Sequence, residues 1–369
     1  MKVIYLVKSQ NSVMWKWQTI HIISELRENG LLGEVVDIGD NRWAANLREA
    51  IEECSKLKLS HCSIILSFLD DKSMPSEFFD IAKENGIPTV LICFDNLHVP
   101  HKHKRIVKFF DLVWLTSHET EWLFRRWGAK KVVCLPYAAN PDIVHGSQAV
   151  KLVNHVGFLG SLYGSRVNQL SYLKSKSVPL EVITGRRSDL DYIKKGRGMR
   201  YFGYLKEVVL HSQTKVGRKL LLGNIRNRRE RSRAVDSLEN CVTVANTSFN
   251  EMYKYFRSWA VTLNITELRN TGILLRPVYK LHLRTFEIPM SYGLQLTAYT
   301  EELAQYFKED KEILFYRNWE EMADKAKFWV DGSKSSAIKK MKQAARERSL
   351  KEHTWTHRFH KIFKALDLR

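Results

Sequence analysis

The chain has 369 residues, 44% of them hydrophobic, and its 59 lysines and arginines outnumber its 40 acidic residues, for a net charge of +19. This length suits two domains that each bury a core of their own, and the positive charge predicts attraction to polyanions. The sequence holds no run of about 18 apolar residues, and its apolar start at residues 1–8 is too short for a signal peptide, so we expect a cytoplasmic protein without a membrane-spanning helix.

The cysteines are scattered along the chain, and no two of them form a C-x-x-C pair. We therefore expect reduced thiols and no zinc site. His98, His101 and His103 are interpreted as an exposed basic loop rather than a metal site, because no acidic or cysteine ligand completes the group. The sequence thus predicts neither a metal nor a cofactor. The five cysteines are Cys54, Cys62, Cys93, Cys134 and Cys241.

Apolar runs alternate with segments of helical periodicity over the first 140 residues. Strands are predicted at 1–7, 34–38, 62–68, 88–94, 112–116 and 131–135, and helices at 11–28, 41–58, 75–85, 104–110 and 119–127. Such alternation is typical of a parallel sheet covered by helices on both faces, so residues 1–140 are predicted to form a Rossmann-like domain. Lys8-Ser9-Gln10-Asn11 follows the first strand in place of G-x-G-x-x-G, which argues against a dinucleotide cofactor.

A polar linker at 136–151 precedes a second alternation of strands and helices. Strands are predicted at 155–159, 180–184, 241–245, 261–265, 294–299 and 313–316, and helices at 166–174, 248–259, 300–307, 319–330 and from 335 onward. Residues 141–350 are therefore predicted to form a second Rossmann-like domain. Because ligands of doubly wound sheets bind at the carboxyl ends of the strands, we expect the site in a cleft between the two domains.

An anion-binding motif is predicted at residues 283–293, where an arginine, a carboxylate and a glycine share one turn region. The guanidinium of Arg284 offers a planar fork of donors to phosphate, and the carboxylate of Glu287 can accept from a ribose diol. If a helix starts at Phe286, its free N–H groups also face the anion. The alternative is an Arg–Glu pair that caps an ordinary helix.

The second half of the chain resembles the GT-B glycosyltransferases of group 1 type, in particular the CgeB-type spore-maturation proteins and their relatives in surface polysaccharide synthesis. The matching segments occur in the family's order at 157–161 with Arg166, 263–266, 283–289, 307–322 and 352–358. The resemblance implies an α/β fold of GT-B architecture, with two doubly wound domains that face an interdomain cleft and a basic helical insertion at about 194–238. It also implies that a C-terminal helix at 351–369 crosses back to the first domain.

By this resemblance the second domain binds a nucleotide sugar. Glu287 would bind the ribose, Arg284 and Arg166 would neutralise the diphosphate, and the backbone at Gly160 and Ser161 would approach the phosphates. Many retaining relatives carry a second glutamate eight residues before the ribose-binding one, where this chain has Tyr279, so neither a retaining mechanism nor a donor sugar is predicted. The expected donor-binding set is Gly160, Ser161, Arg166, Asn264, Arg284, Thr285 and Glu287.

A base for the acceptor hydroxyl would be needed in an inverting reaction. Asp95 and His118 each follow a predicted strand, where a catalytic side chain would face the cleft. Turn formation and helix capping are the alternative roles for these two residues.

Basic residues are concentrated between Lys194 and Arg233, where thirteen occur with two acids. Apolar residues are interspersed with them in a predicted helical hairpin at 206–233, a composition suited to an anionic membrane surface or to an acidic acceptor. A solvated basic helix is the alternative. The arginines expected to make this contact are Arg226, Arg228, Arg229 and Arg231.

Together these patterns predict a metal-independent glycosyltransferase that moves a sugar from a nucleotide donor to a hydroxyl of a glycan or a polyprenol-linked glycan at the inner membrane face. The first domain would bind the acceptor and the second the donor. A basic nucleic-acid-binding protein and a non-catalytic GT-B relative remain alternatives. Nucleic-acid binding has charge in its favour, but no recognition helix, zinc finger or aromatic platform.

Overall fold

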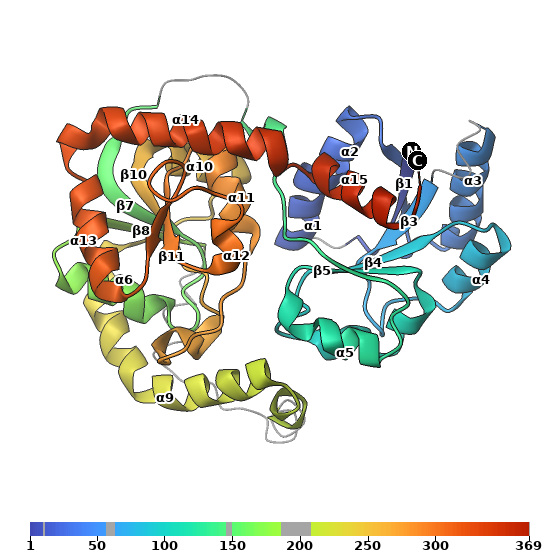
Figure 1. Cartoon of the computed structure of the whole chain (residues 1–369), viewed down its shortest axis with the longest axis horizontal. Helices are drawn as coiled ribbons and strands as arrows, with labels where there is room; N and C mark the ends of the chain where they lie inside the picture. Colours follow the sequence, from blue (N-terminus) through green and yellow to red (C-terminus); the bar gives the residue numbers. More distant parts are fainter. Residues whose placement is uncertain (10–11, 57–62, 145–149, 186–207, 369) are drawn as a thin grey trace. The chain divides into compact units, whose positions relative to one another are not determined.

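A computed structural model describes residues 1–9, 12–56, 63–144, 150–185 and 208–368 of the chain. The chain divides into two compact units (Figure 1). Unit 1 comprises Met1–Asp142 and His353–Arg369, and unit 2 comprises Ile143–Glu352. No helix in the described ranges is long and apolar enough to cross a membrane.

Unit 1 is built on a six-stranded parallel sheet in the order β2-β1-β3-β4-β5-β6. The strands are β1 (Lys2–Val7), β2 (Leu32–Asp37), β3 (Ser63–Ser67), β4 (Thr89–Cys93), β5 (Leu112–Leu115) and β6 (Val132–Cys134). Strand order reverses between β1 and β3, the kind of position at which such sheets bind ligands.

Helices cover both faces of this sheet. The long first helix runs through α1 (Val13–Gln18), a π-helical turn (Thr19–Ile23) and α2 (Ser24–Glu28), and α15 (Trp355–Ala365) packs beside α2. The rings of Trp17, Trp114 and Trp355 meet there, 5.6 and 5.8 Å apart at their centroids. The other core layer includes α3 (Trp43–Lys56), α4 (Glu77–Glu84) and α5 (Glu121–Arg126).

Unit 2 is also a doubly wound parallel sheet, in the order β12-β11-β10-β7-β8-β9. Its strands are β7 (Val153–Leu159), β8 (Leu180–Thr184), β9 (Val242–Val244), β10 (Trp259–Asn264), β11 (Gln295–Ala298) and β12 (Leu314–Tyr316). The reversal of strand order lies between β7 and β10. The Trp259 ring of β10 packs against Gly157 of β7, where a Cβ would lie 1.8 Å from the ring.

The helices of unit 2 form a layer on each face of its sheet (Figure 1). One layer contains α6 (Arg166–Ser175), α9 (Lys215–Leu238) and α13 (Trp319–Trp329), and the other contains α10 (Phe249–Ser258), α11 (Leu283–Met290) and α14 (Ser335–Glu352). The short α12 (Glu301–Ala304) follows β11. The predicted α/β class with two doubly wound sheets is therefore confirmed.

Three local predictions were wrong. No helix forms at 104–110; two 3-10 turns, Pro100–His103 and Val107–Phe109, flank a stretch in which Asp71 accepts the backbone N–H groups of Arg105 and Ile106 and so competes with helical bonding. The C-terminal helical run is interrupted, because Thr354 is extended and caps α15. His103, expected in an exposed loop, is buried.

Candidate functional site

The turn after β7 carries the first predicted site residues. Gly160 donates its N–H to the Ile183 carbonyl at 3.0 Å and Ser161 is exposed, so this turn extends from the carboxyl edge of the sheet. Arg166 is the first residue of α6, and its Nη1 donates to the Ser161 carbonyl at 3.1 Å. The structure thus brings Gly160, Ser161 and Arg166 together at one side of the strand-order reversal.

The Arg166 guanidinium is held in place by aromatic rings. Its Cζ lies 4.1 Å from the Tyr163 ring centroid and 5.7 Å from that of Phe158. Its Nε is buried without a hydrogen-bond partner among the described protein atoms. A positioned guanidinium with an unused buried donor is suited to an anionic ligand.

Helix α11 begins at Leu283, three residues before the predicted start. His282 precedes it in extended conformation, and the Thr285 hydroxyl accepts the His282 N–H at 3.4 Å, a local bond that fixes this earlier beginning. Arg284 therefore lies in the first turn, where the positive end of the helix dipole adds to its own charge.

Arg284 and Glu287 form an ion pair through Nη1 and Oε2. The Glu287 side chain is 0% exposed while that of Arg284 is 25% exposed, and Arg284 also lies over the Phe256 ring at 5.5 Å. The Arg284–Glu287 pair, which the sequence analysis gave as the alternative to an anion-binding motif, is thus present. Glu287 holds the guanidinium, and the partly exposed guanidinium is what a ligand can reach.

The pKa of His282 reflects its burial and the positive charge around its side chain. Burial, together with the charges of Arg166, Lys280 and Arg284, lowers the pKa of its imidazole to about 3. Its Nε2 lies 3.1 Å from the Ile265 carbonyl oxygen. The imidazole is neutral, and it is acted on by Arg166 of α6 and by Lys280 and Arg284 of its own stretch of chain.

Glu267 is a buried carboxyl that the sequence analysis did not select. It follows β10 by three residues, at the other side of the strand-order reversal, and is 6% exposed. Burial raises its pKa; Gln169, the Tyr316 hydroxyl at 3.3 Å and the charge of Arg166 oppose that rise. Its backbone pairs with that of Tyr279. Its position beyond a strand end was the only signal in the sequence.

Asn264 and Thr285, two predicted donor-binding residues, are turned into the protein interior. Asn264 Nδ2 donates to Gln295 Oε1 at 2.6 Å and to Thr285 Oγ1 at 3.3 Å, and both residues are at most 2% exposed. They connect β10, β11 and the start of α11. Their geometry supports the position of Arg284 rather than direct ligand contact.

Unit 1 has a pocket of about 260 Å³ where its own strand order reverses. Its walls come from the ends of β1, β3 and β4 and from α1, so the pocket opens at the carboxyl edge of the sheet, as expected for this fold class. Carboxylates and aromatic rings both contribute. The residues that line it are Lys8, Ser12, Met14, Trp15, Gln18, Phe68, Leu69, Asp70, Ser73, Phe94, Asp95, Val99, Lys102 and His103.

Asp95 is exposed and lines this pocket. Asp70, half-buried, and His103, buried, also line it and were not selected as site residues by the sequence analysis. Burial and the charge of Lys102 lower the pKa of His103 to about 4, against the opposing charges of Asp70 and Asp95. The imidazole is therefore neutral. His118 is outside the pocket: it follows β5 and lies 3.7 Å from the carboxylate of Glu121. The structure thus does not bring the two predicted bases together in this pocket.

Helix α9 presents a mixed basic and apolar stripe to solvent. Arg218, Leu222, Ile225 and Arg226 are exposed at spacings of four, seven and eight residues, which places them along one face. Leu222 is 58% and Ile225 71% exposed. The beginning of the predicted basic insertion and the side chains of Arg228, Arg229 and Arg231 lie outside the described part of the structure.

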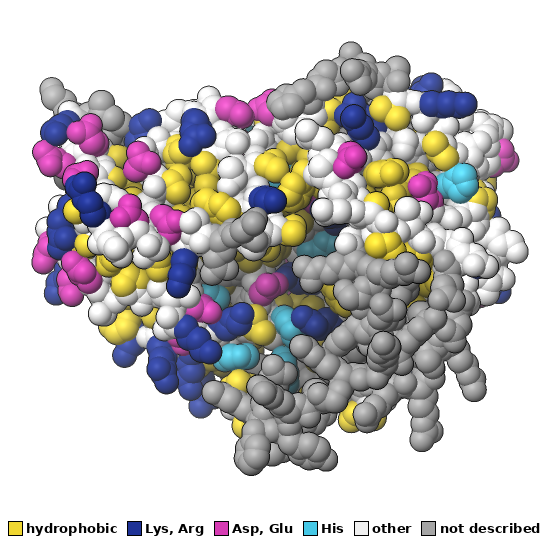
Figure 2. Space-filling model, turned by 180° about the vertical axis from the view of Figure 1, so that it is seen from behind, with side chains coloured by type: hydrophobic (Ala, Val, Ile, Leu, Met, Phe, Trp, Pro, Cys, Tyr) yellow, Lys and Arg dark blue, Asp and Glu magenta, His cyan; other side chains and the backbone are white. Residues whose placement is uncertain are grey.

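Elsewhere on the surface, basic side chains occur among acidic ones. Figure 2 shows Lys and Arg mixed with Asp and Glu over much of the face seen from behind. In the sequence, basic residues are concentrated between Lys194 and Arg233.

Comparison with known proteins finds similarity over the whole chain. Residues 210–364 match a family model described as glycosyl transferase-like. The crystal structure of Anabaena HepE with UDP-glucose aligns with a TM-score of 0.55 at 11% identity, over 100% of this chain and 99% of that one. A glycosyltransferase from Rickettsia africae gives 0.51 at 11% over 98% and 97%. No curated protein matches the sequence.

A third solved structure has the same extent of similarity. Sucrose-phosphate synthase from Thermosynechococcus elongatus aligns with a TM-score of 0.51 at 12% identity, over 99% of both chains. At such identities the likeness shows a shared fold. The alignments extend across both doubly wound sheets, so the fold is shared throughout the chain.

Proposed function

Because the chain has the GT-B fold of these glycosyltransferases and a glycosyl transferase-like region at residues 210–364, we propose that it transfers a sugar from a nucleotide donor to a hydroxyl group. The observation that carries the proposal is a pair of guanidinium groups near the strand-order reversal of unit 2: Arg166, held over the Tyr163 ring after β7, and Arg284, partly exposed in the first turn of α11. A leaving nucleoside diphosphate accumulates negative charge, which fixed cations stabilise.

The proposed donor is a nucleotide sugar, and UDP-glucose is the first to test because HepE was crystallised with it. Arg166 and Arg284 would bind the diphosphate, and the turn at Gly160 and Ser161 would approach it. Glu287 would keep Arg284 in place; contact with a ribose would require its carboxylate to become accessible. With the phosphate charge taken by arginines, donor binding would need no metal.

Isothermal titration with UDP and UDP-glucose in EDTA tests the donor site. We expect Arg166→Gln and Arg284→Gln each to weaken binding roughly tenfold or more, because a hydrogen bond to a charged group contributes about 1.5–3 kcal/mol. Lys339→Gln with Lys340→Gln, which removes two exposed cations of α14, is the control and should bind as the unmodified protein does. Equal affinity in all variants would remove the assignment.

The acceptor would bind in the pocket of unit 1, with Asp95 as the base. Aromatic faces and carboxylates together suit the apolar faces and hydroxyl groups of a sugar ring. We therefore propose a glycan or lipid-linked glycan acceptor in surface polysaccharide synthesis. Asp95→Asn should reduce acceptor-dependent UDP release about 100-fold or more while leaving UDP affinity unchanged. Unchanged release would exclude Asp95 as the base.

We further propose that the stripe on α9 binds an anionic membrane surface. Arginines can bind lipid phosphates while Leu222 and Ile225 enter the headgroup region. Leu222→Ser with Ile225→Ser should weaken sedimentation with phosphatidylglycerol vesicles, and Arg218→Gln with Arg226→Gln should do so more strongly at low salt. Lys339→Gln with Lys340→Gln again provides the control. Binding that is equal in all three variants would contradict the proposal.

A further inference from the structure

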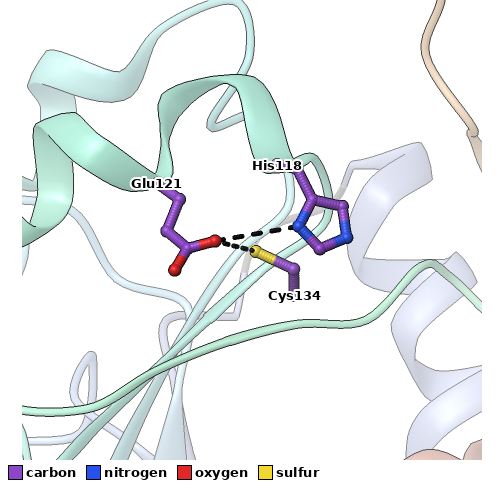
Figure 3. Close-up of side chains that lie close together, drawn as sticks. All are labelled: His118, Glu121 and Cys134. Carbon is purple, nitrogen blue, oxygen red and sulfur yellow. Dashed lines mark hydrogen bonds and ion pairs between the residues drawn. The ribbon is translucent and has the colours of Figure 1, made fainter.

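The side chains of His118, Glu121 and Cys134 converge in the β5–α5–β6 segment of unit 1 (Figure 3). His118 lies in the 3-10 turn after β5, Glu121 is the first residue of α5, and Cys134 is the last residue of β6. Their potential ligand atoms all lie within 4.8 Å of one another. His118 and Glu121 lie in the continuous 3-10 turn and helix at 118–126, and Cys134 ends a strand of the sheet, so the convergence is a property of the fold.

The two distances from the Glu121 carboxylate are close to the edges of a tetrahedral zinc site. Glu121 Oε2 is 3.7 Å from His118 Nδ1 and 3.5 Å from Cys134 Sγ. Zinc bonds of about 2.1 Å to nitrogen or oxygen and about 2.3 Å to sulfur give ligand separations of roughly 3.4–3.6 Å at tetrahedral angles. Only small side-chain adjustments would be needed for all three atoms to contact one ion.

Arg125 orients the carboxylate for this purpose. Its Nε and Nη2 donate to Glu121 Oε1 at 2.9 and 2.6 Å, so the carboxylate is held through one oxygen. The other oxygen, Oε2, is the one that faces His118 and Cys134. Such support for a ligand from a neighbouring hydrogen bond is common in metal sites.

We propose that His118, Glu121 and Cys134 bind one zinc ion, with water in the fourth position. An imidazole, a carboxylate and a thiolate form a donor set that zinc accepts, whereas magnesium and calcium prefer oxygen ligands. The His118 side chain is 62% exposed, which provides a path for the ion and room for the water ligand. On binding, the Cys134 thiol loses its proton to solvent and the resulting thiolate bonds the metal.

This site is separate from the proposed donor chemistry, because all three ligands belong to unit 1 while Arg166 and Arg284 belong to unit 2. It also does not use the pocket that contains Asp95. Zinc binding can therefore be present or absent whether or not the proposed glycosyltransferase activity is correct. The alternative explanation of this group is that its side chains only form hydrogen bonds at the start of α5. A direct measurement of metal binding distinguishes these two explanations.

The test uses the full chain after dialysis against EDTA, with cobalt(II) as the optical probe and zinc as its competitor. We expect one cobalt per chain, a near-ultraviolet thiolate-to-cobalt band and displacement by one equivalent of zinc. Cys134→Ser should abolish the band, and His118→Ala and Glu121→Gln should each weaken zinc binding at least tenfold. Cys241→Ser, which replaces a partly buried thiol of unit 2, should keep the band.

Thermal unfolding and UDP binding show that each variant is folded. Zinc should raise the melting temperature of the unmodified chain and of Cys241→Ser but not that of Cys134→Ser. UDP affinity should be the same in Cys134→Ser and the unmodified chain. A folded Cys134→Ser variant that retains the cobalt band and the zinc-induced rise, or an unmodified chain that binds no cobalt, would overturn the proposal.

Discussion

Glu25 should make the docking of the C-terminal helix depend on pH. Its side chain is fully buried, and its two oxygens accept the N–H groups of Trp355 and Thr356 at 3.1 and 2.6 Å, at the start of α15. Burial raises its pKa from 4.5 to about 7, although the hydrogen bonds from Thr356 and Trp355 act in the opposite direction. In this position the charged form is disfavoured despite the positive end of the helix dipole.

The direction in which stability changes with pH follows from proton binding by Glu25. Between pH 4.5 and about 7 the folded protein holds a proton on Glu25 that the unfolded chain has released, so stability falls as pH rises through this window. A rise in pKa from 4.5 to about 7 corresponds to roughly 3 kcal/mol. That contribution is fully present below pH 4.5 and is lost as the pH passes 7.

Hydrogen exchange of the α15 backbone amides measures this effect locally. After correction for the intrinsic exchange rate, the opening free energy of α15 should fall by about 3 kcal/mol between pH 4.5 and pH 8. Glu25→Gln, which has no charge to bury, should show a nearly flat profile, whereas Glu28→Gln, an exposed change on the same helix, should follow the unmodified chain. A Glu25→Gln variant with the original pH dependence would refute the reasoning.

Three further predictions concern unit 2. Arg284→Met should lower the free energy of unfolding by about 3 kcal/mol because it removes the guanidinium that pairs with the buried Glu287 carboxylate, and adding Glu287→Gln should restore most of it in denaturant titrations. Gly157→Ala should destabilise the unit by several kcal/mol, since the new methyl group overlaps a buried ring; Gly185→Ala, with open space around it, should be nearly neutral. Lys342 is buried with a pKa of about 7 rather than 10.5, so stability should rise by roughly 5 kcal/mol between those pH values and Lys342→Met should remove the rise.

Each of these three has a clear contrary result. Additive losses in the double variant at Arg284 and Glu287 would show that the ion pair does not couple the two residues. Equal melting temperatures for the two glycine variants would show that β7 can move away from β10 at little cost. An unchanged pH profile in Lys342→Met would place that dependence on other groups.

Strands were predictable because their apolar runs are long enough to fill a sheet buried on both faces. Each observed strand overlaps a predicted one, and the parallel order follows from the helices between them. Helix beginnings were less predictable. The start of α11 depends on His282 and Thr285, whose mutual bonding is not a common capping pattern, and the missing helix near 104–110 depends on a carboxylate from Asp71, far away in sequence.

The residues of the candidate donor site could be predicted in part, because some of them lie at strand ends or helix starts. Arg166 and Arg284 follow strand ends or begin helices, positions that a sequence can identify. The inward orientation of Asn264 and the burial of Glu267 arise from packing between distant segments, so no local pattern shows them. The grouping of His118 and Glu121 with Cys134 likewise requires β6 to lie beside β5, which only the sheet order supplies.

The proposed donor site combines two guanidinium groups with buried acids. Glu287 is paired directly with Arg284, while Arg166 lies over the Tyr163 ring with its Nε buried and unused by the described protein atoms. Burial raises the pKa of Glu267, and the charge of Arg166 opposes that rise. Guanidinium groups match the oxygens of a nucleoside diphosphate better than the hydroxyl groups of a neutral sugar, which is why nucleotide affinity, rather than sugar affinity, is the measurement on which the donor assignment depends.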